Sequence, residues 1–355
     1  MTRVWDVPVH DSTRVRDARV AAERAADHAG LDKDRTAAAA LVATELATNL
    51  LKHAGGGQVL IDTVDAGLTP DSGGRAVQIV AIDHGPGITD LPSALSDGYS
   101  TASSLGAGLG TCRRVADDFD LQSTPGRGTV ALARIRAVRG DRSRQDAQGA
   151  DEPVRAGGVN VPLAAAEHSG DAWACVRAGD HVTLLLADGL GHGEAAAEAS
   201  GAALDELRHR PHLPPVELLG RLHTALRRTR GAAVAVARLD LDARTLDFAG
   251  VGNVGARLRS GGGWQPLLSH PGIVGAHHPA RLPGQRLPWT ADSLLILHSD
   301  GLPSRWSPPP AVPLDSLDPA VTAAVIVRDS SSAARPVRDD TTVAVLTPVP
   351  PDREP

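Results

Sequence analysis

The spacing of apolar positions changes near the middle of the chain and predicts two domains. In the first part, apolar residues at helical spacing predict helices over 15–29 and 35–53, each followed by glycine. Shorter apolar runs predict strands over 58–64, 77–82, 119–123 and 129–135, with one more helix near 109–117. This order predicts an α/β sandwich with helices packed on one face of a mixed sheet.

The second part is rich in strands and follows a polar, charged stretch with no hydrophobic period. Apolar runs predict strands over 172–177, 181–187, 232–239, 245–250, 254–258, 293–298 and 342–346, with helices over 194–209 and 215–228. Many strands with grouped helices predict an α+β fold, a layered β-sandwich. We therefore divide the chain into a first domain (1–137), a linker (138–157), a second domain (158–347) and a proline-rich tail (348–355).

Composition narrows the class of protein. Hydrophobic residues make up 42% of the 355 positions but aromatics only 2%, so both cores must be built from Ala, Val and Leu. The net charge of -6 argues against a nucleic-acid partner and offers no basic patch for a membrane. The two cysteines, one in each half, form no disulfide framework. No apolar run has the length of a signal peptide or a membrane span, so we expect a cytoplasmic protein.

The first domain contains the residue types of a Mg-ATP site. Glu45 and Asn49 are four apart on a predicted helix, so one can orient a nucleophile while the other coordinates Mg²⁺. Asp83 ends a predicted strand, where it can accept a hydrogen bond from adenine, and Gly85 and Gly87 allow close backbone approach. Before the next helix, Gly106, Gly108 and Gly110 can present N–H groups to phosphates. Each motif alone is common in polar helix faces and loops, but four in this order favour a nucleotide site.

Residues 13–137 resemble the GHKL superfamily of ATPases and kinases, and within it the RsbT-like serine kinases of bacterial partner-switching systems. The resemblance is carried by ELATN at 45–49, DHGPGI at 83–88, DGYST at 97–101, GAGLG at 106–110, DDF at 117–119 and GRGT at 126–129. It implies the Bergerat ATP-binding fold, Asn49 as the Mg²⁺ ligand, Glu45 as the base, Asp83 and Thr129 on adenine, and a lid over 98–110. It also implies phosphorylation of a Ser or Thr on a STAS-domain antagonist.

The second domain places carboxylates at the ends of predicted strands. Asp188 precedes a glycine-rich turn in which Gly189 can offer its carbonyl oxygen, and Asp300 follows an apolar strand. Asp339 and Asp340 precede another. Asp-Gly pairs are by themselves usually turns. Carboxylates converging from several strands can instead hold two divalent cations ~3.5–4 Å apart, which activate water against a phosphate ester.

Residues 155–346 resemble the SpoIIE-type branch of the metal-dependent (PPM) Ser/Thr phosphatases, including the small RsbX-like members. The motifs are SGD at 169–171, ADGLGHG at 187–193, VGN at 251–253, SDG at 299–301 and RDDTT at 338–342. The resemblance implies the PPM fold, with Asp188, Gly189, Asp300 and Asp339 as ligands of Mn²⁺ or Mg²⁺, Asp171 as an additional ligand, and two ions. Asp340 remains an alternative to Asp339. His192 is either a structural turn residue or catalytic, and no arginine matches the phosphate-binding one of classical members.

Three functional interpretations remain open. The preferred one is a bifunctional regulator in a bacterial stress or sigma-factor pathway, which phosphorylates and dephosphorylates STAS-domain anti-sigma antagonists. The alternative keeps the phosphatase but treats the first domain as a nucleotide-gated, non-catalytic docking module, with an anti-sigma or downstream switch protein as partner. Glu45 favours a kinase, because a docking module needs no base. A vestigial phosphatase is disfavoured by the full set of aspartates. The resemblance also admits a homodimer.

Overall fold

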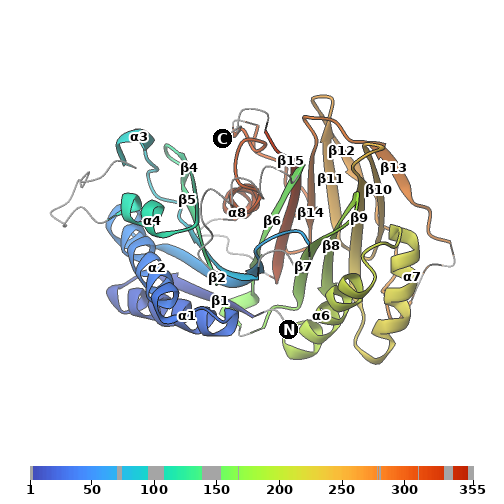
Figure 1. Ribbon diagram of the computed structural model, residues 1–355, viewed down its shortest axis with the longest axis horizontal. Helices are drawn as coiled ribbons and strands as arrows, with labels where there is room; N and C mark the ends of the chain where they lie inside the picture. The colour runs from blue at the N-terminus through green and yellow to red at the C-terminus, as the bar shows by residue number, and fades with distance from the viewer. Residues whose placement is uncertain are drawn as a thin grey trace.

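The computed structural model describes residues 3–69, 74–94, 108–137, 153–166, 168–277, 279, 281–310, 312–331 and 339–350. Three five-stranded sheets and their helices form successive layers (Figure 1). Across the molecule the order is two helices, the first sheet, one helix, the second sheet, the third sheet and two further helices (Figure 1). In the described part of the chain, no helix combines the length and apolar character needed to cross a membrane.

The first domain is one antiparallel sheet covered by two long helices. Its strands are β1 (Val4–Val9), β2 (Gly57–Asp65), β3 (Arg75–Ile82), β4 (Asp118–Thr124) and β5 (Gly128–Arg136), and its helices are α1 (Ser12–Ala29), α2 (Lys33–Ala54), α3 (Leu91–Ala94) and α4 (Leu109–Val115). The sheet order is β1-β2-β3-β5-β4. Every strand pair described in this sheet is antiparallel, so the prediction of a mixed sheet was wrong.

Capping and small side chains explain the two long helices. The Asp11 carboxylate accepts a hydrogen bond from the Thr13 N–H at 2.8 Å, and Asp32 caps α2 through the Arg35 N–H at the same distance. Gly30 and Gly55 end the helices with φ near 70°, a conformation that glycine adopts without strain. Because the buried faces consist largely of alanine, the helices pack closely on each other and on the sheet.

The second domain is a sandwich of two sheets with helices on its outer faces. Its elements are β6 (Val154–Val161), η1 (Leu163–Ala165), β7 (Asp171–Ala178), β8 (His181–Gly189), α6 (Glu194–His209), α7 (Pro215–Ala225), η2 (Leu226–Arg228), β9 (Ala232–Asp240), β10 (Thr245–Val251), β11 (Gly255–Ser260), β12 (Gly263–Leu267), β13 (Gln285–Pro288), β14 (Leu294–His298), α8 (Pro319–Ser330) and β15 (Thr341–Pro348). The sheet orders are β12-β11-β14-β15-β6 and β13-β10-β9-β8-β7. Side chains from both sheets form one core between them, and α6 and α7 cover the outer face of the latter sheet.

Two differences from the predicted organisation matter for function. The strand β6 begins at Val154, inside the stretch 138–157 predicted to be the linker, and pairs with β15 along its whole length. Its two adjacent glycines are more typical of a linker than of a strand, so the sequence did not indicate it. The helix α8 was not predicted, because its sequence AVTAAVIV is apolar on all sides and lacks a polar face. Residues 138–152 lie outside the described residues, so the domain boundary there remains a proposal.

The position of α8 explains its apolar sequence, because the helix lies between the two domains (Figure 1). One side packs on β6 and β15, and the other side packs on the face of the first sheet that α1 and α2 leave uncovered. That face presents Leu60, Val80 and Leu132 to the helix. The two domains therefore share one continuous apolar core through α8.

A buried carboxyl in this interface makes stability depend on pH. Asp62 of β2 is 7% exposed, and the amide of Gln78 contacts both Asp62 and, at 3.0 Å, the carbonyl oxygen of Gly158 in β6. Burial raises the pKa of Asp62 to about 7, although Arg134 acts in the opposite direction. Ionised Asp62 is therefore unfavourable in the folded protein.

We expect the free energy of unfolding to fall as the pH rises from about 4 to about 7. The contribution of Asp62 is fully present below the unfolded-state pKa and is lost as the pH passes the higher folded-state pKa, by on the order of 4 kcal/mol at most. Asp62→Asn should flatten this part of a urea-unfolding profile against pH, and the exposed Asp242→Asn should not. Identical slopes for wild type and Asp62→Asn would contradict the assignment.

Candidate functional sites

In the first domain, α2 carries the predicted base and magnesium ligand on one face. Glu45 and Asn49 are both partly buried, and the Asn49 side-chain nitrogen is buried without a hydrogen-bond partner in the described residues. Burial raises the pKa of Glu45, and Lys52 opposes this shift. The pKa of Cys112 in α4 is raised to about 12 by burial and then by the charge of Glu45, so the start of α4 lies beside the predicted base.

The predicted adenine-binding pair lies where β3 ends and β5 begins. The Asp83 carboxylate accepts hydrogen bonds from the N–H groups of Gly85 at 2.8 Å and Thr129 at 3.2 Å. The side chains of Thr129 and Ser123 are 2.9 Å apart. Burial raises the pKa of Asp83, while the two N–H donors lower it. Gly85 is required sterically, because a Cβ there would lie 2.7 Å from Ala54 at the end of α2.

The glycine-rich segment is described only in part. Gly108 precedes the first turn of α4, where its carbonyl oxygen accepts from the Thr111 N–H at 3.0 Å, and Gly110 is buried in that turn. Gly106 and the predicted lid residues 98–107 lie outside the described residues. The structure thus places Glu45 beside α4 and joins Asp83 to Thr129, whereas the binding roles of these residues remain predictions.

In the second domain, two predicted ligands lie directly opposite each other on neighbouring strands. Asp171 of β7 pairs with Asp188 of β8 in the antiparallel register. Like charges in such a pair repel each other unless a cation or proton compensates them. Burial and then the charge of Asp188 hold the pKa of Asp171 well above its usual range, and one Asp171 side-chain oxygen is buried without a described hydrogen-bond partner.

Further carboxylates approach the same place from the facing sheet. Burial raises the pKa of Asp188 to about 7, and after burial the charges of Asp300, Asp339 and Asp340 add to the shift. Asp300 follows β14, and the other two precede β15, so two sheets contribute to one acidic cluster. We call Asp171, Asp188, Asp300, Asp339 and Asp340 the carboxylate cluster.

The residues present fit hard divalent cations. A cluster of like charges at the edge of a buried core is costly without a compensating cation, and oxygen donors suit Mg²⁺ and Mn²⁺. Among the described residues, no three acidic, histidine or cysteine side chains converge closely enough to hold one ion by themselves.

Hydrogen bonds distinguish the two neighbouring aspartates. Both Asp340 carboxylate oxygens accept from backbone N–H groups, one from Leu163 and one from Gly170, each at 2.7 Å. Asp339 is exposed, and one of its oxygens accepts from the Asp340 N–H at 2.9 Å. Asp340 therefore ties β15 to the loops after β6 and before β7, and Asp339 is the better candidate for a metal ligand.

We expect Asp340→Asn and Asp339→Asn to have opposite effects. The first leaves a buried N–H without an acceptor and should lower the free energy of unfolding by about 1–3 kcal/mol. The second should change stability by less than about 0.5 kcal/mol but strongly reduce metal-dependent phosphate release. Thermal unfolding and a phosphatase assay on both variants measure this, and the reverse pattern would exchange the two roles.

Two residues near the cluster had no role assigned from the sequence. Asn253, in the VGN motif, donates a hydrogen bond from its side chain to the Asp300 carboxylate and thereby orients it. Arg230 places its guanidinium beside the loop after β8, since a Cβ on Gly191 would lie 3.0 Å from its Nη1. It precedes β9 in sequence, far from the acidic motifs, so no spacing pointed to it. His192 is exposed in the same loop.

The comparisons with known proteins assign both halves. Residues 9–134 match the histidine kinase-like ATPase domain family, and residues 178–348 match the stage II sporulation protein E (SpoIIE) family. The first part of the chain therefore matches a histidine kinase-like (GHKL) ATPase domain, and the second part matches a SpoIIE domain. The fold predicted for each half from its motifs is thereby confirmed.

Each half also has a curated relative in Bacillus subtilis (strain 168). The chain is 42% identical to the serine/threonine-protein kinase RsbT over 90 residues, which are 25% of this chain and 64% of that protein. It is 29% identical to the phosphoserine phosphatase RsbX over 119 residues, 33% of this chain and 59% of the relative. The chain thus spans somewhat under two thirds of each. A crystal structure of RsbX with magnesium aligns with 56% of this chain and 97% of that chain at 22% identity and a TM-score of 0.47.

Proposed function

We propose that this protein is a bifunctional partner-switching regulator. Its first domain phosphorylates a Ser or Thr of a STAS-domain anti-sigma antagonist with Mg-ATP, and its second domain removes that phosphate. The observation that carries the proposal is the presence, in one chain, of a complete ATP-site motif set and a carboxylate cluster. The similarity to RsbT over one half and to RsbX over the other supports it.

In the kinase half, Glu45 accepts the proton of the substrate hydroxyl. Its raised pKa, caused by burial, makes the carboxylate a better proton acceptor. Asn49 lies one helical turn away, so the Mg²⁺ ligand and the base face the same γ-phosphate. Asp83 and Thr129 fix the adenine, and the first turn of α4 faces the phosphates. The whole arrangement serves to hold ATP in position relative to the attacking hydroxyl.

In the phosphatase half, Asp188, Gly189, Asp300 and Asp339 would hold the divalent cations, with Asp171 as a further ligand. When bound, the cations supply an activated water and neutralise charge on the phosphate. Asn253 orients Asp300, and Asp340 fixes the position of the Asp339 turn. Arg230 is the cation that could bind the phosphate oxygens beside the Gly191 loop.

A second candidate function keeps the phosphatase and makes the first domain a nucleotide-gated docking module. The intact Glu45, partly buried beside α4, favours the kinase, because a docking module does not need a base at that position.

A binding assay and a phosphate-release assay test the pair of functions. The substrate is a STAS-domain protein carrying phosphoserine, and the readouts are its intact mass after incubation with Mn²⁺ and the binding of ADP by calorimetry. We expect both dephosphorylation and ADP binding. Phosphoserine that remains on the substrate after incubation with Mn²⁺ and this protein would refute the phosphatase assignment. The absence of ADP binding would refute the ATP site.

A further inference from the structure

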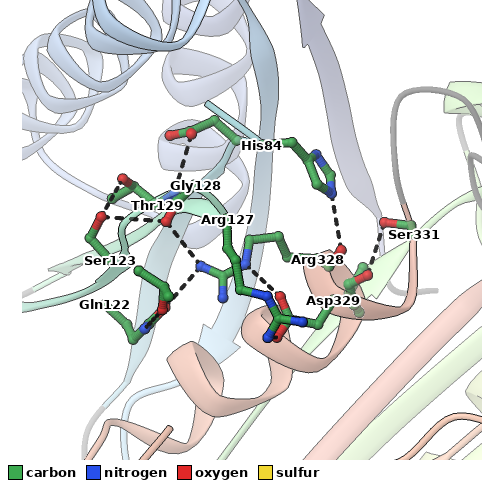
Figure 2. Close-up of polar contacts among 12 residues, drawn as sticks. His84, Gln122, Ser123, Arg127, Gly128, Thr129, Arg328, Asp329 and Ser331 are labelled. Atoms are coloured by element: carbon green, nitrogen blue, oxygen red, sulfur yellow. Dashed lines mark hydrogen bonds and ion pairs between the residues drawn. The ribbon is translucent and has the colours of Figure 1, made fainter. Parts of the chain in front are cut away.

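The C-terminal end of α8 contacts the part of the first domain that carries the predicted adenine-binding pair, Asp83 and Thr129 (Figure 2). Arg328 is 1% exposed, although it carries a full charge. Its Nη1 donates to the Gln122 side chain at 2.8 Å and to the Gly128 carbonyl oxygen at 3.2 Å. Its Nε donates to the Asp329 carboxylate at 2.9 Å. A guanidinium removed from water in this way requires these partners, so its position is closely fixed.

Arg328 contacts the sequence neighbours of both Asp83 and Thr129. Gly128 precedes Thr129, and its carbonyl oxygen takes the Arg328 hydrogen bond. His84 follows Asp83, and its Nε2 lies 3.0 Å from the Arg328 carbonyl oxygen (Figure 2). A Cβ on Gly128 would overlap the Asp83 carbonyl, so the start of β5 and the residues after β3 are in direct contact. One residue of the second domain therefore contacts both segments that carry the predicted adenine-binding pair.

The charge of Arg328 also reaches the adenine-binding carboxylate. Burial raises the pKa of Asp83, and Arg328 is one of the charges that lower it again. The cation therefore favours the ionised carboxylate, which is the form that accepts a hydrogen bond from an adenine amino group.

The N-terminal end of α8 also forms hydrogen bonds with the first sheet. The Arg134 guanidinium of β5 forms two hydrogen bonds with the Asp318 carboxylate, at 2.8 and 2.9 Å, and Asp318 caps the helix through the Ala320 N–H. The Asp318 N–H donates to Asp120 of β4 at 2.6 Å. Polar contacts at both ends and the shared apolar core between them fix α8 on the first sheet.

The opposite side of α8 supports strands that lead to the carboxylate cluster. It packs on β15, which begins at Thr341 directly after Asp340, and on β6. Its first turn lies so close to β6 that a Cβ on Gly157 would be 2.7 Å from the Ala320 nitrogen. Close packing of this kind transmits displacement, because it has no free volume to absorb it.

We propose that Arg328 is a positioning residue of the nucleotide site, supplied by the phosphatase domain, and that α8 links occupancy of that site to the strands β6 and β15. The linkage rests on the proposed ATP site in the first domain. It has two consequences: nucleotide binding needs Arg328, and bound nucleotide stabilises α8 in its contact with both sheets. Such a coupling is reciprocal by thermodynamic necessity.

Two measurements on the full chain test this proposal. The first is the Kd of ADP, by calorimetry with Mg²⁺, for wild type, Arg328→Gln and Arg286→Gln. The control makes the same chemical change outside the nucleotide-site motifs, because Arg286 of β13 pairs with Asp247 of β10 at 2.7 Å and its side chain is 73% exposed. We expect Arg328→Gln to raise the Kd about tenfold, a loss of about 1.4 kcal/mol, and Arg286→Gln to leave it unchanged.

The second measurement needs no variant and so does not depend on how Arg328→Gln folds. Hydrogen–deuterium exchange of wild type with and without ADP should show slower exchange in α8, at least about fivefold, and slower exchange in β15. A role of Arg328 in folding alone would not produce this change. Unchanged exchange in α8 with ADP bound, or an unchanged Kd in Arg328→Gln, would overturn the linkage alone. Wild type that binds no ADP would overturn the proposed ATP site and the linkage together.

Discussion

Replacing Asp188 and Asp300 together by asparagine is expected to stop Mn²⁺-dependent phosphate release while making the metal-free protein more stable. The two carboxylates belong to one cluster, in which burial and then the charge of Asp300 raise the pKa of Asp188 to about 7. On the proposed roles, the double replacement removes two ligands of divalent cations that would supply several kcal/mol of transition-state stabilisation. Activity should fall at least about a hundredfold. The loss of repulsion should raise the Tm of the metal-free protein by a few degrees, on the order of 1 kcal/mol.

The combination of the two effects separates a metal site from a structural one. Asp242→Asn, in an exposed turn of the same domain, serves as the control and should change neither quantity. The measurements are phosphate release over a Mn²⁺ titration and the Tm with and without metal. A variant that loses activity and also loses stability would indicate damage to the fold. A variant that retains activity would place the catalytic centre elsewhere.

Glu45→Gln is expected to abolish phosphate transfer to the STAS-domain substrate without weakening nucleotide binding. Glutamine keeps the shape of the side chain but cannot accept the hydroxyl proton, and loss of a general base typically costs about 10²–10⁴-fold in rate. Since Asp83 and Thr129, the proposed adenine-binding pair, do not lie on α2, the Kd of ADP should change by less than about twofold. The measurement is a single-turnover transfer assay beside calorimetric binding.

Glu23→Gln is a suitable control, because Glu23 lies on α1 and its ion pair among the described residues is with Arg19, one turn away. It should leave both transfer and binding unchanged. Unchanged transfer in Glu45→Gln would remove Glu45 from the chemical step, and a large loss of ADP affinity would make it a binding residue instead.

The helices and strands that carry the motifs were predictable, because residues within or next to each element mark its start, its end or its apolar face. Capping aspartates and terminal glycines mark α1 and α2, and apolar runs before Asp83, Asp188 and Asp300 mark strands that end at a functional side chain. In the first domain the structure joins Asp83 to Thr129 and places Glu45 beside α4, and in the second it brings the predicted aspartates into one cluster. Their binding roles still require the experiments above.

The elements that connect the domains were not predictable from local signals. The helix α8 has no polar face, because both of its sides are covered, so its sequence carries no helical period. The strand β6 has glycines at 157 and 158, which allow α8 and Trp173 to approach closely and which suggest a linker when read locally. The role of Arg328 depends on Gln122 and Gly128, some 200 positions earlier in the chain.

One labelling experiment tests the account of two opposed activities most directly. The full chain is incubated with Mg²⁺, Mn²⁺, a STAS-domain protein and ATP labelled with ³²P on the γ-phosphate, in wild type and in the Asp188→Asn, Asp300→Asn variant. We expect label to accumulate on the STAS-domain protein only when the two phosphatase aspartates are replaced. No label with either protein, while ADP still binds, would contradict the kinase and favour a docking module. Equal label with both proteins would contradict a phosphatase that acts on the same partner.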